Sequence, residues 1–167
     1  MAKLETLLKA ASDYIDKATV FLVFLIICAM VAVTTLQVIC RVFFAALTWS
    51  EELSRYLLVW GTFFAATLAY KRGNHIAITF VIEAFPQKIH ALFVTISYLL
   101  SLVFFATAAY FGVEMIQMQV FQISPAMSIP MKYIYYSIPI SMIIMMLHAL
   151  AGIAGRIRQI AAKEEAA

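Results

Sequence analysis

Charged and apolar residues alternate over the first seventeen positions of the chain. The apolar positions fall on one stripe of a helix, and they are Leu4, Leu7, Leu8, Ala11 and Ile15. This spacing predicts an amphipathic helix over residues 3–17 that lies in the membrane interface. Residues 18–40 then carry no charge. Because a helix rises about 1.5 Å per residue and the hydrocarbon core is about 30 Å thick, we expect a first span over about 18–40.

Three further segments have the length and apolar character of membrane spans, at about residues 51–70, 89–113 and 132–155. The first of these starts after Thr48 and carries Glu51 three residues later, which fits a capping box with Thr48 as the N-cap. Pro139 predicts a kink in the last one. Residues 76–85 are also apolar but too few to span, so we expect an interfacial segment there.

Composition supports a membrane location for the whole chain. Hydrophobic residues make up 65% of the sequence and charged residues 13%, against about 45–50% and 25% in soluble domains. A soluble chain of this length could not bury so much apolar surface in one core. We therefore predict an all-α integral membrane protein with four transmembrane helices plus the N-terminal amphipathic helix, in a single membrane domain over residues 1–167. No basic stripe indicates a nucleic-acid partner.

The distribution of lysine and arginine predicts the orientation. Most of the twelve fall on one side of the predicted spans, namely Lys3, Lys9, Lys17, Lys71, Arg72, Lys88, Arg156, Arg158 and Lys163. The opposite side receives Arg41, Arg55 and Lys132. Because cytoplasmic segments carry the excess of positive charge, we expect both termini in the cytoplasm.

A cluster of charges is predicted at the outer end of the first two spans, formed by Arg41, Glu51, Glu52 and Arg55. Glu51 and Arg55 are four residues apart on one helix, so they can form an ion pair. One interpretation is an ion-pair cluster that orients the helices, and the other is a contact surface for a second protein. No Asp or Glu lies in the middle of a predicted span. We therefore do not expect this chain to carry out ion-coupled transport alone.

Two specific hypotheses about function can be weighed from the residues. His90 and His148 would both lie near the cytoplasmic side, where a histidine pair on facing helices could hold a haem in a membrane anchor subunit. The simpler interpretation is that His148 is packed or hydrogen-bonded between helices. A small homodimeric transporter is the other alternative, although it would be expected to place an acidic residue within a span. No catalytic nucleophile, phosphate-binding loop or metal motif indicates an enzyme.

The ordered motifs around the second span resemble a known family. Arg41, the run Trp49-Ser50-Glu51-Glu52-Leu53-Ser54-Arg55-Tyr56, Trp60 and the run Lys71-Arg72-Gly73-Asn74-His75-Ile76 are similar to the small, DctQ-type membrane subunit of tripartite ATP-independent periplasmic (TRAP) transporters. The resemblance covers about residues 18–155. The sequence departs from the family pattern at Val42, Ala65 and Thr79.

The resemblance implies an accessory scaffold subunit in the bacterial inner membrane. It would pack against a large permease subunit, which carries the sodium-coupled transport of an organic acid of the C4-dicarboxylate or sialic acid class. It would also help to dock a periplasmic binding protein. The resemblance implies no cofactor in this chain, with the sodium ions held by the large subunit. The candidate partner-interface residues are Arg41, Trp49, Glu51, Glu52, Arg55 and His75.

Overall fold

The computed structural model describes residues 2–73 and 87–164, with side chains at 6–73, 93 and 95–155. The helices in this part of the chain are α1 (Ala2–Phe43), α2 (Thr48–Lys71), α4 (Gln87–Met118), α5 (Lys132–Tyr135) and α6 (Ser137–Glu164). The predicted all-α class is confirmed for these residues, which otherwise hold only an isolated bridge between Ile123 and Pro130. The interfacial segment expected at 76–85 lies outside them.

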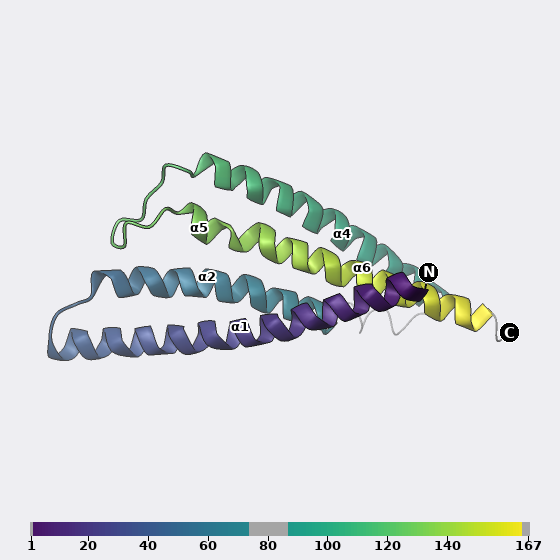
Figure 1. Cartoon of the computed structure of the whole chain (residues 1–167), viewed down its shortest axis with the longest axis horizontal. Coiled ribbons are helices and arrows are strands. Elements are labelled where there is room, and N and C mark those ends of the chain that lie inside the picture. The colour runs from purple at the N-terminus through teal and green to yellow at the C-terminus, as the bar shows by residue number, and fades with distance from the viewer. Residues whose placement is uncertain (1, 74–86, 165–167) are drawn as a thin grey trace.

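The long helices form two antiparallel hairpins, one of α1 with α2 and one of α4 with α6 (Figure 1). Both hairpin connections, residues 44–47 and 119–131, lie at the same end of the molecule, which we call the loop end. The start of α1 and the end of α6 lie together at the opposite end, the terminal end. The two hairpins converge there and diverge toward the loop end (Figure 1).

The first helix is continuous, which corrects the expected boundary after residue 17. α1 runs through 42 residues from Ala2 to Phe43 without a break. It contains no glycine or proline, so nothing in the backbone interrupts it where the charged segment meets the uncharged one. The change in composition therefore marks a change of environment along one helix. Within Ala2–Phe43 no separate amphipathic helix is present.

Three helical stretches are long and apolar enough to cross a membrane, at Thr6–Phe43, Thr95–Met118 and Lys132–Gly155, within the part of the chain that was searched. These agree with three of the four predicted spans. α2 has 24 residues but is not among the three. Charged residues occupy its first two turns and hydroxyl side chains are spread over the remainder, which lowers its hydropathy.

Two span boundaries also differ from the prediction. α4 continues through Glu114 to Met118, because glutamate and glutamine favour helices and polarity alone does not end one. The last span is divided at Tyr136 into α5 and α6. Pro139, in the first turn of α6, has no N–H to donate to the carbonyl of Tyr135 and its ring would clash there. The helix is interrupted at Tyr136, three residues before the proline at which a kink was expected.

The core lies along α6, which contacts α1, α2, α4 and α5. Its buried apolar centre consists of Phe105 of α4 with Met142 and Met145 of α6. Tyr70 of α2 meets Phe105 edge-on, with ring centres 4.9 Å apart, which is a favourable aromatic geometry. Apolar packing is therefore concentrated where α2 and α4 converge on α6.

Small hydroxyl residues are buried where the helices approach one another. Ser50, Thr67, Ser137 and Ser141 are all 0% exposed. Each donates a hydrogen bond of 2.7–2.8 Å to a carbonyl three or four residues earlier. Their hydroxyl donors are thus satisfied locally, and their small size allows helix backbones to pack closely, as is common in membranes.

The outward faces of α1 and α4 are covered with large apolar side chains. Phe21, Phe24 and Leu100 are between 60% and 70% exposed. Only 6% of the most apolar stretch of α1 is buried within the structure. Because contiguous apolar surface of this extent is not stable in water, lipid or another membrane protein must cover it.

Candidate functional site

The ion pair predicted at the start of α2 is confirmed. An Arg55 guanidinium nitrogen lies 2.6 Å from Glu51 Oε1, and the two side chains are 73% and 62% exposed. A pair of this kind, four residues apart on an exposed helix face, contributes only about 0.3–0.5 kcal/mol. Its charged groups therefore remain available to a second molecule at little cost to the fold.

Glu52 has a different role from its neighbour. Its Oε2 atom accepts hydrogen bonds from the main-chain amides of Ala126 (3.0 Å) and Met127 (2.9 Å), which lie in the loop between α4 and α5. The hydroxyl of Tyr56, one turn along α2, donates to Oε1. Glu52 thus attaches the second hairpin's loop to the first hairpin, and we regard it as a positioning residue.

The loop that Glu52 holds, residues 119–131, is also organised internally. The amide of Ser124 donates to the carbonyl of Ile129, and the amide of Met131 donates to the carbonyl of Gln122, both at 2.9 Å. Ser128 adopts a left-handed backbone conformation with φ 56°, which is unfavourable for a residue with a Cβ atom. Such a conformation persists where surrounding bonds determine it, as they do here.

A cleft of about 430 Å³ separates this loop from the start of α2. Its α2 wall carries Glu51, Glu52 and Arg55, and its loop wall includes Pro125 and Ala126. We call it the loop-end cleft. It offers an exposed ion pair beside a fixed loop, which suits recognition of a protein surface. The exposed charges of Glu51 and Arg55 are groups that can bind a second molecule.

The remaining candidate residues are not drawn into this cluster. Arg41 is exposed in the last turn of α1 and forms no hydrogen bond or ion pair in the part of the chain that the structure describes. Trp49, the second residue of α2, is 37% exposed. His75 lies outside the described residues. The predicted cluster of four charges therefore reduces to one ion pair and one inward-facing carboxylate.

The capping box expected at Thr48 is wrong. α2 already begins at Thr48, its N-cap is Leu47, and no side chain makes a capping hydrogen bond. The hydroxyl of Ser50 instead donates to the carbonyl of Leu47 at 2.8 Å. A capping side chain must accept hydrogen bonds from amides of the first turn, and Thr48 lies inside that turn.

A second polar cluster, at the terminal end, was not predicted from the sequence. Lys71 Nζ lies 2.8 Å from Asp13 Oδ1 and 3.8 Å from Asp16 Oδ2, and it donates to the carbonyl of Ser12 at 2.9 Å. These contacts bind the end of α2 to residues 12–16 of α1. Asp13 and Asp16, three residues apart on one helix, were the available signal, but their distant partner was not evident.

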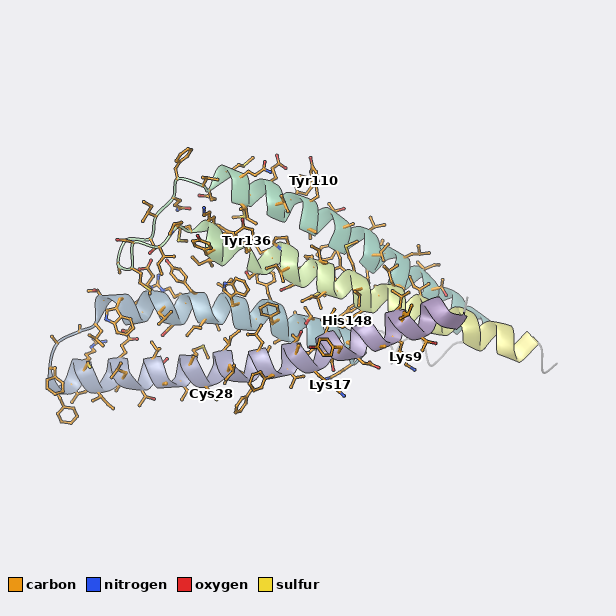
Figure 2. The ribbon with its side chains drawn as sticks, viewed as in Figure 1. Lys9, Lys17, Cys28, Tyr110, Tyr136 and His148 are labelled. Atoms are coloured by element: carbon orange, nitrogen blue, oxygen red, sulfur yellow. The ribbon has the colours of Figure 1, made fainter. Side chains whose placement is uncertain are left out.

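The same cluster extends to α6 through His148. The hydroxyl of Ser12 and Nδ1 of His148 are 2.8 Å apart, and the two residues are 3% and 4% exposed. Figure 2 shows His148 beside the crossing of α1 over α6. The interpretation of His148 as a histidine hydrogen-bonded between helices is confirmed. The side chain of His90, the other member of the haem pair considered above, lies outside the described residues.

A polar cleft of about 380 Å³ lies at this cluster, with Lys9, Lys71 and His148 in its walls. Tyr98 of α4 reaches over Gly152 of α6 there. A Cβ atom added at Gly152 would lie 2.8 Å from Cε1 of the Tyr98 ring, closer than real Cβ atoms approach other atoms. Glycine at 152 therefore allows α4 and α6 to meet closely at the terminal end.

Comparison with known proteins places these features in a family. The profile of the family described as tripartite ATP-independent periplasmic transporters, DctQ component, matches residues 30–159. The isethionate TRAP transporter permease protein DctMQ of Oleidesulfovibrio alaskensis is 28% identical over 68% of this chain and 18% of its own length. The sialic acid TRAP transporter permease protein SiaT of Haemophilus influenzae is 29% identical over 80% of this chain and 22% of its own length.

A third relative has a similar size. It is a chain of Haemophilus influenzae named as a candidate TRAP transporter small permease protein, 25% identical over 78% of this chain and 79% of its own length. The chain thus spans about a fifth of the two longer relatives and most of the shorter one.

Proposed function

This chain belongs to the DctQ family of TRAP transporter components, and from that premise we propose that it is an accessory scaffold subunit of a sodium-coupled importer. It is a transporter component and not an enzyme. It packs against a large permease subunit in the bacterial inner membrane and helps to dock a periplasmic substrate-binding protein. Two relatives support a large membrane partner. DctMQ and SiaT are each named as one permease protein, and this chain matches only about a fifth of each. The remainder of such a permease corresponds to the proposed large subunit.

The observation that carries the proposal is the separation of apolar surface from charge. Residues 18–40 hold no charged group, and the outward faces of α1 and α4 expose large apolar side chains. The charged groups with described contacts lie toward the two ends of the hairpins, where Lys71 joins α2 to α1 and Glu52 joins α2 to the α4–α5 loop. A scaffold needs these properties, whereas an ion pathway needs ionisable groups inside the membrane.

We further propose four crossings with both termini in the cytoplasm. α2 returns alongside α1 from the loop end, so a membrane crossed by α1 is crossed again by α2. The start of α1 and the end of α6 lie together at the terminal end (Figure 1). Most lysines and arginines belong to segments that connect at that end, which supports a cytoplasmic location for it.

Each candidate residue then has a proposed role. Arg41, Trp49 and the Glu51–Arg55 pair contact the large subunit or the docked binding protein on the periplasmic side, while Glu52 positions the loop beside them. His75 fixes the cytoplasmic connection. This chain holds no cofactor, and the sodium ions are bound by the large subunit. The substrate is an organic acid, and the sialic acid named for one relative supports this class.

Co-expression with the large permease subunit tests the proposal. A tag on this chain is expected to recover the large subunit from detergent extracts, and Arg55→Glu is expected to lower that recovery or the uptake of substrate. Uptake is measured in cells that also produce the binding protein. Purification of this chain as a stable monomer that transports by itself in liposomes would overturn the scaffold role. A Soret absorbance band in the purified chain would replace it with the haem-anchor alternative.

A further inference from the structure

The two hairpins leave a furrow between them in the membrane-crossing part of the molecule. α2 and α4 both pack on α6, and they meet each other through the rings of Tyr70 and Phe105. The space between them is an apolar groove of about 430 Å³. Its walls include Thr62 and Ala66 of α2 and Phe104 of α4, and its floor is formed by Met142 and Met145 of α6. We call it the α2–α4 furrow.

The furrow and the loop-end cleft lie along the same face of α2. Thr48, Glu52 and Arg55 line the cleft, and Thr62 and Ala66 line the furrow. These positions follow one another at intervals of three or four residues, or multiples of them, which places them on the same face of a helix. From the start of α2 to its last turn this face is about 33 Å long at 1.5 Å per residue. That length is sufficient for contact with a helix across the whole hydrocarbon core.

The α2 wall of the furrow differs from the faces that meet lipid tails. The outward faces of α1 and α4 are convex and carry large side chains such as Phe24 and Leu100. The furrow wall carries exposed small residues, Thr62, Ala66 and Ala69. The hydroxyl of Thr62 is satisfied by the carbonyl of Leu58 at 2.7 Å. Small residues at such positions allow a second helix to approach closely, which is the main basis of helix association in lipid.

We propose that the α2–α4 furrow receives one transmembrane helix of the large permease subunit. The inference rests on the proposed function and adds to it the surface that binds the partner. The first two relatives supply the argument for this occupant, because about four fifths of each chain lies outside the part that matches this one. The remainder is covalently attached and therefore at high local concentration. The ion pair of Glu51 and Arg55, in the loop-end cleft on the same face of α2, is available to polar groups at the end of that helix.

Two neighbouring alanines provide a matched test. Ala65 and Ala66 are both exposed on α2, but only Ala66 lines the furrow. Ala66→Leu fills the wall and is expected to lower recovery of the large subunit at least tenfold in co-purification from membranes that contain both subunits. Ala65→Leu adds the same side chain one residue away and is expected to leave recovery within twofold of the unsubstituted chain. Equal amounts of this chain in the membrane show that both variants fold.

The outcomes separate the inference from the proposed function. If the unsubstituted chain recovers no large subunit, the proposed function fails. If it does recover the large subunit and Ala66→Leu recovers as much as Ala65→Leu, the scaffold role stands and the furrow assignment is wrong. Two other outcomes overturn the inference, both with unchanged recovery of the large subunit by Ala66→Leu. If that variant loses bound phospholipid, the furrow holds a lipid tail. If it loses a homodimer, the furrow binds a second copy of the chain.

Discussion

Replacing Gly152 with alanine is expected to displace the ring of Tyr98 where α4 packs on α6 at the terminal end. The added Cβ atom would lie 2.8 Å from Cε1 and 2.9 Å from Cζ of Tyr98. The nearer distance is 0.6 Å inside the 3.4 Å at which ordinary van der Waals contact begins. Overpacking of this kind costs about 1–3 kcal/mol. Alanine is favoured over glycine in a helix by about 1 kcal/mol, which offsets part of the cost.

Gly155 is the matched control for this change. It lies in the same helix, and an added Cβ atom there meets no atom within 4 Å in the described structure. Gly155→Ala should therefore gain the helix preference without the clash. The two variants are expected to differ by about 1–3 kcal/mol in free energy of unfolding, with Gly152→Ala the less stable.

Reversible unfolding of the purified chain in mixed micelles, at increasing fractions of SDS, measures this difference. Tyr98→Ala supplies the mechanism test, because removal of the ring removes the clash. In the Tyr98→Ala background, Gly152→Ala should no longer be less stable than Gly155→Ala, which is a non-additive result expected only for residues in contact. Equal stability of Gly152→Ala and Gly155→Ala with Tyr98 present would refute tight packing of the Tyr98 ring on Gly152.

Three further perturbations test the contacts at the two ends of the molecule. Glu52→Gln removes the anionic acceptor of the α4–α5 loop, so hydrogen exchange of the loop amides should become several-fold faster. Glu51→Gln is the control and should leave that exchange unchanged. Equal exchange in the two variants would contradict the anchoring role of Glu52. Lys71→Met should speed amide exchange around residues 12–16 of α1, because their ionic link to α2 is lost. Unchanged exchange would show that the link is not needed. Ser12→Ala or His148→Leu alone should each lower the free energy of unfolding by about 1–3 kcal/mol, because the remaining buried partner loses its hydrogen bond. The double variant should be closer to neutral. Additive losses in the double variant would argue against the hydrogen bond.

Local spacing predicted some contacts of this protein and could not predict others. The pairing of Glu51 with Arg55 follows from their separation of four residues on one helix, and the structure has it at 2.6 Å. Glu52 binds main-chain amides more than seventy residues away. Those amides have no side-chain signature, so sequence alone could not assign Glu52 a role different from that of Glu51.

Composition located the membrane-crossing segments more reliably than the helix ends. The charged segment before residue 18 was interpreted as a separate helix, although α1 continues through it. Likewise α4 extends to Met118, beyond the apolar stretch that ended the predicted span. Lipid selects for apolar side chains, whereas the backbone ends a helix at glycine, proline or a cap. The two kinds of boundary need not coincide.

The contacts among Ser12, Lys71 and His148 depend on the arrangement of three helices. Each residue had a plausible local interpretation, such as the charged face of a helix or the end of a span. Only the crossing of α1 over α6 brings Ser12 within 2.8 Å of His148. A contact between residues 136 positions apart requires the tertiary fold, which local periodicity does not provide.

Reconstituted uptake tests the central claim most directly. Proteoliposomes that contain the large permease subunit, with or without this chain, are supplied with the binding protein, a sodium gradient and radiolabelled sialic acid, succinate or isethionate. The account predicts sodium-driven uptake of the substrate that the binding protein carries when both membrane subunits are present, and none from either subunit alone. Equal uptake without this chain, or uptake by this chain alone, would contradict its role as a required scaffold subunit.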